Sequence, residues 1–424
     1  MFYLKRQRQR PAKCSTLLIL PLALMASSWA LAETPGPVTV EAGANSQTAL
    51  EYWTEERMRN ARPMDRQAVV RDSDSPMVLR GPGMSEPGYV PGWAPGSGPQ
   101  PDPLDRVTIY EDDDLYDLFM GEISPMTWGS ASFNPTDWSS YGPFHRHTHF
   151  GKYTTYPMST IGKLFFSQGG GNFVCSASVI GRSTIVTAGH CVSDGNGNFN
   201  TNFLFCPSYR KGPGSGEPHP DRGCWGWSSA TTSTQYHNSA NVDYDYGCIV
   251  TQTTGDTVSN KVGNVTGWTG RAWGGSIFFH QIAMGYPAGS PFPGYHIVAC
   301  NGTEWYEVQR AGSADGQKSK YIGCDMTGGS SGGPWWFGLR HPNGSFNYPD
   351  TDGSNVTAPW VGSAMIRGLN SHARCQNSCY TPPNASGGTY FQEMGSPYFQ
   401  STAAHNNSSE SVFEICLNHA NNDA

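Results

Sequence analysis

Two short strings, one built around a histidine and one around a serine, most constrain how this chain can fold. Thr187–Cys191 reads TAGHC, and Thr327–Pro334 reads TGGSSGGP. A histidine that accepts a hydroxyl proton and a serine set among glycines are what a hydrolase needs to make a nucleophile at neutral pH. The glycines leave room for backbone N–H groups to face a developing oxyanion. A fold that uses both strings must bring together side chains that are far apart along the chain.

Three other segments support the same class of function as the histidine and serine strings. They are the Gly-Gly pair ahead of Ser330-Ser331, Asp245-Tyr246-Gly247 with the following Cys248-Ile249-Val250, and Gly285-Tyr286-Pro287. With the two strings they resemble the trypsin-like serine peptidases of the chymotrypsin fold, and within them the glutamyl endopeptidase branch. The resemblance spans roughly residues 150 to 370, and the order His–Asp–Ser agrees with it. It implies two six-stranded antiparallel β-barrels with the catalytic cleft between them, His190 and Asp245 coming from the first barrel and Ser331 from the second.

The residues themselves also favour an all-β fold. Charged residues make up only 14% of the chain, which contains 51 Gly and 31 Pro, a usage rich in turns. Short strand-like runs separated by Gly, Asn and Ser recur from Tyr156 onward, among them 161–166, 173–180, 247–250 and 295–299. Many short strands with turn signals between them predict barrels or a sandwich.

The N-terminus has the pattern of an export signal. Basic residues between Lys5 and Lys13 precede the apolar run 17–26, and Ala30-Leu31-Ala32 is typical of a cleavage site. A membrane anchor is the alternative, but the apolar run is short and contains Pro21. We therefore predict a signal peptide over residues 1–32 and a soluble protein that is secreted, or periplasmic in a double-membrane bacterium, with no membrane attachment after the signal is removed.

Residues 33–145 differ in composition from the rest of the chain. Residues 49–61 are a helix candidate ended by Pro63, the stretch 81–101 is a Pro/Gly-rich linker, and 111–114 is acidic. We predict a largely irregular pro-segment that is removed on maturation, the alternative being a disordered tail that stays. Arg146, in a histidine cluster at a solvated junction, is one candidate for the cut, and residues 146–424 form the peptidase domain.

The resemblance assigns a role to each residue of the site. Ser331 is the nucleophile, because the motif places the reactive serine directly before Gly-Gly-Pro. His190 is the general base that later protonates the leaving amine. Asp245 holds the imidazole tautomer, and its rival Asp243 is expected to be a solvated neighbour. The backbone N–H groups of Gly329 and Ser331 form the oxyanion hole.

Substrate specificity stays open. Asp325, six residues before Ser331, stands where trypsin-like enzymes carry the acid that attracts Lys or Arg, although glutamyl endopeptidases can also have an acid there. Asn370 stands where the glutamate-selective branch has a histidine, and His372 lies two residues further on. Ser330 replaces the aspartate to which digestive trypsins pair their freed N-terminus, so activation must act differently, by unblocking the cleft.

The cysteine count fits an exported protein. Apart from Cys14 in the signal, ten cysteines remain, an even number that allows up to five disulfides. The resemblance implies Cys175–Cys191, which closes the loop of His190. Nearness in sequence favours Cys206–Cys224, Cys300–Cys324 and Cys375–Cys379 and leaves Cys248–Cys416, although the sequence does not fix the connectivity. Zinc is the competing interpretation of Cys375 and Cys379, but no second close pair accompanies them.

Other classes of function have little support. The net charge of −7 provides no basic surface for nucleic acid. Asp194–Asn198 resembles part of a calcium loop without its terminal glutamate, so we expect no metal and no cofactor. The hypothesis is a monomeric, exported serine endopeptidase that acts on proteins or peptides through an acyl-enzyme. A catalytically silent trypsin-like binding protein and an esterase with the same triad are the alternatives.

Overall fold

The computed structural model describes residues 35–43, 48–70, 88–90, 144–149 and 156–421, together with a few isolated residues. The larger gaps in the last range are 212–217, 275–279, 338–347, 350–354, 357–363 and 377–392. Pro35–Ala424 form one compact unit. Within the described ranges, no helix has both the length and the apolar character that crossing a membrane requires. The predicted signal peptide, most of the Pro/Gly-rich linker and the acidic run lie outside the described residues.

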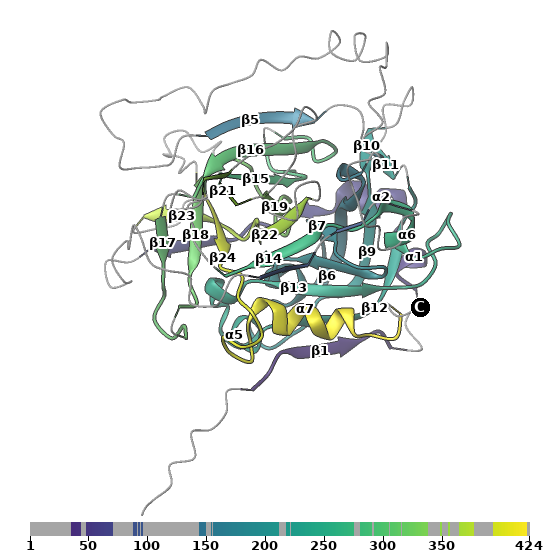
Figure 1. Cartoon of the computed structure of the whole chain (residues 1–424). Coiled ribbons are helices and arrows are strands. Elements are labelled where there is room, and N and C mark those ends of the chain that lie inside the picture. The colour runs from purple at the N-terminus through teal and green to yellow at the C-terminus, as the bar shows by residue number, and fades with distance from the viewer. Residues whose placement is uncertain are drawn as a thin grey trace, which may run out of the picture. The chain divides into compact units, whose positions relative to one another are not determined.

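Six antiparallel strands close into a barrel in the first half of the peptidase region (Figure 1). The barrel closes because β12 pairs with β13 and also, through Trp225 and Gly226, with β9. Around the barrel the strands are β12 (Trp225–Thr232), β13 (Gly247–Thr251), β8 (Thr184–Thr187), β7 (Gly171–Val179), β6 (Ile161–Gln168) and β9 (Thr201–Pro207). The first predicted barrel is confirmed.

Local sequence explains how this barrel forms. β6 and β7 are joined by Gly169-Gly170, both with positive φ, the backbone that a two-residue hairpin turn requires. Large apolar side chains from several strands fill the interior, with Leu164, Phe165 and Ile185 fully buried. Burial of such side chains stabilises a barrel by about 2 kcal/mol each.

The second half is also β-rich but is arranged as two sheets. One has the order β4 (Gly88–Val90), β14 (Gly270–Trp273), β22 (Met365–Leu369), β19 (Pro334–Phe337), β15 (His280–Gly285), β16 (Ile297–Thr303), β5 (Phe144–His149). The other has the order β17 (Tyr306–Val308), β18 (Ser319–Gly323), β24 (Glu393–Pro397), β23 (His372–Gln376), β3 (Gln67–Val70). No strand pairing among the described residues joins these sheets, so the second predicted barrel is not confirmed. Two further pairs of strands form separate two-stranded sheets. They are β10 (Tyr209–Lys211) with β11 (Pro218–Pro220), between β9 and β12, and β20 (Tyr348–Pro349) with β21 (Asn355–Val356).

The helices of the peptidase region are short. They are η2 (Met158–Thr160), α4 (Gly189–Val192), α5 (Thr234–Ser239), η3 (Val242–Tyr244), α6 (Val262–Thr266) and α7 (Ser409–Leu417). The C-terminal α7, which the sequence analysis did not anticipate, packs its buried Val412 and Phe413 against the first barrel (Figure 1). The disulfide Cys248–Cys416 ties it to β13.

The described parts of the N-terminal segment contain strands that the sequence did not predict. The expected helix over 49–61 is two helices, α1 (Ala49–Tyr52) and α2 (Glu55–Asn60), because Thr48 and Thr54 each cap a new start. Strands β1 (Val38–Glu41), β2 (Arg62–Pro63), β3 and β4 add to sheets of the peptidase region. At the expected solvated junction, β5 is instead hydrogen-bonded along β16, so a cut at Arg146 would require β5 to leave that strand.

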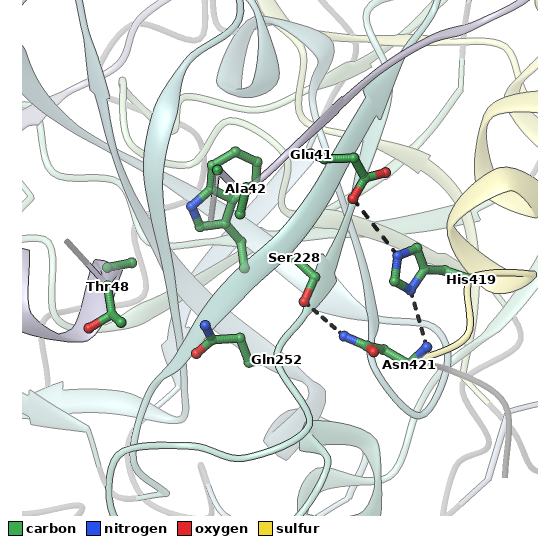
Figure 2. A pocket seen from close by; sticks show the side chains of 10 residues that line it. Glu41, Ala42, Thr48, Ser228, Gln252, His419 and Asn421 are labelled. Carbon is green, nitrogen blue, oxygen red and sulfur yellow. Dashed lines mark hydrogen bonds and ion pairs between the residues drawn. The ribbon is translucent and has the colours of Figure 1, made fainter. Parts of the chain in front are cut away.

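A pocket of about 430 Å³ lies where the N-terminal segment meets the barrel and the C-terminal turn (Figure 2). Asn421 donates through Nδ2 to the Ser228 hydroxyl at 2.8 Å, and His419 lies 4.0 Å from the Glu41 carboxylate. The lining residues are Glu41, Ala42, Gly43, Thr48, Ala49, Trp227, Ser228, Gln252, His419 and Asn421. None of these lining residues is among those predicted for the active site.

Candidate active site

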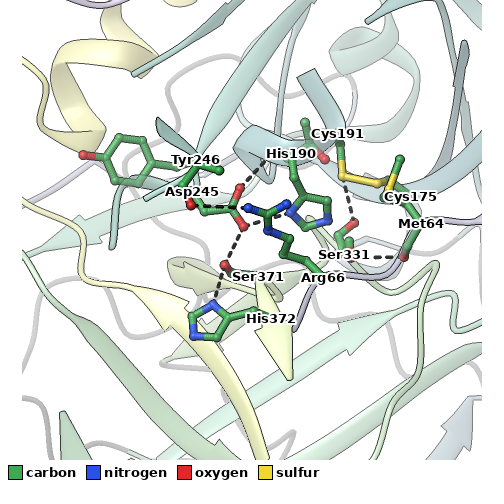
Figure 3. Close-up of polar contacts among 12 residues, drawn as sticks. Met64, Arg66, Cys175, His190, Cys191, Asp245, Tyr246, Ser331, Ser371 and His372 are labelled. Carbon is green, nitrogen blue, oxygen red and sulfur yellow. Dashed lines mark hydrogen bonds and ion pairs between the residues drawn. A yellow bond between two sulfur atoms is a disulfide. The ribbon is translucent and has the colours of Figure 1, made fainter. Parts of the chain in front are cut away.

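His190 is held in place by short-range structure. It lies on the one-turn helix α4, directly after β8, and is 3% exposed. The adjacent disulfide Cys175–Cys191 fixes α4 to β7. The backbone N–H of His190 donates to Asp245 Oδ1 at 2.7 Å, and its Nδ1 lies 2.8 Å from Asp245 Oδ2 (Figure 3). Among the described residues, Nε2 of His190 has no hydrogen-bond partner, so this nitrogen is available to accept a proton.

Asp245 is fully buried at the end of η3, just before β13. Its carboxylate accepts a third hydrogen bond, from the Ser371 hydroxyl to Oδ2 at 2.6 Å. A carboxylate with three donors is oriented firmly toward the imidazole. Ser371 was missed in the sequence analysis, because a serine at the start of a strand carries no local signal of its partner.

The neighbouring Asp243 corrects an expectation. It is not solvated but 0% exposed, and its Oδ1 lies 2.6 Å from Arg310 Nη1. The hydroxyls of Ser313 and Ser319 also donate to it, each at 2.7 Å. Asp243 is thus committed to a separate buried ion pair, while Asp245 is the aspartate that contacts His190.

The two serines of the glycine-rich loop have different environments. Ser330 donates its hydroxyl to the Thr327 carbonyl at 2.8 Å, a contact within the loop. Ser331 lies beside the His190 ring (Figure 3), with its hydroxyl directed to the Met64 carbonyl at 3.5 Å and its backbone carbonyl accepting from the N–H of Ser176 on the first barrel at 2.7 Å. The Ser331 carbonyl also lies 3.8 Å from the sulfur of Cys191, so Ser331 is the serine next to the histidine loop.

Two glycines of this loop have conformations that other residues rarely adopt. Gly329 has φ +92 and Gly332 has φ +82. A Cβ on Gly332 would lie 2.0 Å from Thr187 Oγ1 and 2.3 Å from the Ser176 carbonyl oxygen. The absence of a side chain lets the serine loop approach the strand that leads to His190.

The main chain of the N-terminal segment lies across this site (Figure 3). The Met64 carbonyl oxygen accepts from the N–H of Gly329 at 2.8 Å and from the Ser331 hydroxyl at 3.5 Å, a distance at which the second bond is weak. The Met64 N–H donates to the Val174 carbonyl at 2.9 Å, and Ala373 donates to the Arg66 carbonyl at 3.0 Å. The Gly329 N–H, one of the two predicted oxyanion-hole donors, is thus paired with a peptide carbonyl.

The residues predicted for specificity lie in different surroundings. Asn370 is fully buried, donating Nδ2 to the carbonyls of Met284 (2.9 Å) and Ser330 (3.0 Å) and accepting from Trp335. His372 is 1% exposed and contacts Ser371 and Tyr321. Asp325 is half-buried. A role of these three residues in specificity stays a prediction.

Four of the five predicted disulfides are present: Cys175–Cys191, Cys206–Cys224, Cys248–Cys416 and Cys300–Cys324. The fifth pair includes Cys379, which lies outside the described residues. One group of metal-ligating side chains comes together in the described ranges, formed by Cys175, His190 and Cys191. Its two sulfur atoms are bonded to each other, so they are not the thiolates that a metal would require.

Comparisons with known proteins find similar peptidases. The family model described as Trypsin matches residues 151–219. A glutamyl endopeptidase of Bacillus licheniformis is 27% identical over 187 residues, which are 43% of this chain and 49% of that protein, so the chain spans about half the length of this curated relative.

Two solved structures are also similar. The thermostable serine protease AL20 from an extremophilic microorganism is 31% identical, covering 60% of this chain and 97% of its own, with a TM-score of 0.44. The protease Anisep of Arthrobacter nicotinovorans is 28% identical, covering 60% and 96%, with a TM-score of 0.44. The Trypsin family model and the curated relative are thus consistent with a trypsin-like serine peptidase.

Proposed function

We propose that this protein is an exported serine endopeptidase that hydrolyses peptide bonds through an acyl-enzyme, with Ser331, His190 and Asp245 as its triad. The observation that carries the proposal is the buried His190–Asp245 pair, joined by two hydrogen bonds at 2.7 and 2.8 Å, with Ser331 beside the same ring. The four disulfides support export, because such bonds persist in oxidising compartments.

The chemistry follows from the positions of these atoms. His190 Nε2 takes the proton of the Ser331 hydroxyl as its oxygen attacks the substrate carbonyl carbon. The Gly329 N–H, with that of Ser331, donates to the oxyanion that forms. The carbon–nitrogen bond then breaks, and His190 gives its proton to the leaving amine. Water repeats the sequence on the acyl-enzyme, releasing the acid and restoring Ser331.

A covalent probe tests the proposal directly. A fluorophosphonate is expected to label the processed protein once, and peptide mapping by mass spectrometry is expected to place the adduct on Ser331. An adduct on Ser330 would contradict the assigned nucleophile. Absence of labelling would favour the silent binding protein instead. Comparing peptide and ester substrates of the same acyl group separates an endopeptidase from an esterase.

We further propose that residues 33–145 are a pro-segment that keeps the enzyme inactive. The Met64 carbonyl supports this, since it engages Gly329 and Ser331 and so excludes a substrate carbonyl from the same donors. Removing the segment would free the Gly329 N–H without any new ion pair at Ser330. This mode of activation fits the absence of an aspartate before the nucleophile.

Met64→Pro is expected to raise the fluorophosphonate labelling rate of the full-length protein by about 10-fold. Proline has no N–H, so the bond to the Val174 carbonyl is lost and the segment binds the cleft more weakly. Glu56→Ala, an exposed change on α2, is the matched control and is expected to label like the wild type. Equal rates for the Met64 variant and the wild type would instead fit a tail that does not block the site.

A further inference from the structure

A line of buried polar contacts leads away from Asp245 through Ser371. The Ser371 hydroxyl lies 2.6 Å from Asp245 Oδ2, and His372 Nδ1 lies 2.8 Å from the Ser371 oxygen. The Tyr321 hydroxyl lies 2.8 Å from His372 Nε2, and Arg310 Nη2 donates to the Tyr321 oxygen at 2.7 Å. Four consecutive hydrogen bonds therefore connect a guanidinium to the carboxylate of the proposed triad. Figure 3 shows the end of this line nearest to His190.

The two ends of the line favour one direction for its protons, because the Arg310 guanidinium only donates and the Asp245 carboxylate only accepts. A guanidinium has only donors, so the Tyr321 oxygen accepts from Arg310, and the Tyr321 hydroxyl is able to donate to His372 Nε2. A histidine that accepts at Nε2 carries its proton on Nδ1, and there it donates to Ser371. The Ser371 hydroxyl is then free to donate to Asp245, which as a carboxylate only accepts.

The ring in the middle of the line is suited to this role. Burial lowers the pKa of His372 well below its usual range, and the nearby positive charges of Arg310 and Arg66 act in the same direction. The ring is therefore neutral and able to accept at one nitrogen and donate at the other. It packs against Gly395, where a Cβ would lie 2.3 Å from Nε2, and meets the Tyr321 ring edge-on at 5.4 Å.

The donor end of the line is anchored too. Arg310 Nη1 lies 2.6 Å from Asp243 Oδ1 and 3.0 Å from the Ser319 hydroxyl oxygen. This buried ion pair keeps the guanidinium beside Tyr321. It also accounts for the burial of Asp243, which neither contacts His190 nor belongs to the proposed triad.

We propose that Tyr321 and His372 are positioning residues: with Arg310 donating at the far end, their hydrogen bonds keep the Ser371 hydroxyl directed to Asp245, so that this carboxylate is held toward His190. The proposal rests on the function proposed above for the triad. It assigns to His372 a positioning role rather than a role in substrate specificity.

The tautomer of His372 can be measured without any reference to activity. Long-range ¹H–¹⁵N correlation spectra of histidine-labelled, full-length Ser331→Ala protein, which is expected not to digest itself, identify which ring nitrogen carries the proton. The His372 signals are assigned by their loss when His372→Asn is added. We expect a neutral ring protonated at Nδ1 only. A ring protonated at Nε2 would overturn the proposal, because Ser371 would then have to donate to His372 instead of Asp245.

A matched pair of substitutions tests the consequence for catalysis. In His372→Asn the amide nitrogen can take the place of Nδ1 and donate to Ser371, whereas the similarly sized His372→Leu has no donor. We expect kcat of the processed His372→Leu enzyme to fall about 10-fold with KM within about twofold, because the hydrogen bond that orients the Ser371 hydroxyl is lost. His372→Asn is expected to stay within about threefold of the wild type.

A merely structural role would affect the two variants differently. Equal loss in both, in parallel with their melting temperatures, would contradict positioning through Ser371, and so would wild-type kcat in His372→Leu. If the wild-type protein itself neither reacts with a fluorophosphonate nor cleaves peptides, the proposed function fails. The tautomer measurement then still decides the polarity of the line.

Discussion

Ser331→Ala is expected to lower kcat/KM for peptide hydrolysis by on the order of 10⁶-fold, because the variant has no hydroxyl to form the acyl-enzyme. The measurement is the rate of cleavage of a peptide substrate by the processed protein, with circular dichroism to establish that the variant is folded. Fluorophosphonate labelling should disappear in parallel.

Ser330→Ala is the matched control for this prediction. It removes a hydroxyl whose contact is the Thr327 carbonyl within the same loop. Loss of this one hydrogen bond costs about 1 kcal/mol of stability and should leave kcat/KM within about 10-fold of the wild type. Substantial activity in Ser331→Ala, or equal loss in both variants, would contradict the assignment of the nucleophile.

Asp245→Asn is expected to lower kcat by about 10⁴-fold while the fold is retained. An amide NH₂ facing His190 Nδ1 would force the ring proton onto Nε2, and that nitrogen could then no longer accept the proton of Ser331. The comparison is made by steady-state kinetics at saturating peptide, with thermal unfolding measured on the same samples.

Asp243→Asn separates the two aspartates, which the sequence alone distinguishes only by motif. This change weakens the buried pair with Arg310, so we expect a loss of about 3 kcal/mol in the free energy of unfolding and a much smaller effect on kcat. The reverse pattern, with kcat abolished by Asp243→Asn and preserved in Asp245→Asn, would mean that the catalytic carboxylate had been misassigned.

The parts of the site that the sequence could predict are those carried by local strings. TAGHC, Asp-Tyr-Gly and the glycine-rich serine loop each specify a residue together with its own turn, so His190, Asp245 and Ser331 could be named before their contacts were known. Short strands with glycine turns predicted barrels or a sandwich, and the resemblance narrowed this to barrels. Closure of the first barrel depends on the pairing of β12 with β9, which no local string specifies.

The features that were missed depend on partners distant in sequence. Asp243 looked solvated because the partner that neutralises it, Arg310, is 67 residues away. Ser371 lies 126 residues from Asp245, and no local pattern connects them. The ordered contacts of Met64 were missed for the same reason, since a polar segment with few apolar residues is ordered here by backbone hydrogen bonds to the barrel. Long-range hydrogen bonds leave no periodic trace in a sequence.

The pairing of β1 with β12 has a consequence for handling the mature enzyme. Val38–Glu41 hydrogen-bond along Ser229–Thr232, so this stretch of β12 has its backbone groups satisfied in the unprocessed chain. If maturation releases residues 33–145, the backbone groups of Ser229–Thr232 that paired with β1 become exposed and can pair with a strand of another molecule. Storage of the processed form at high concentration would then favour self-association, which co-purification with the released segment would suppress.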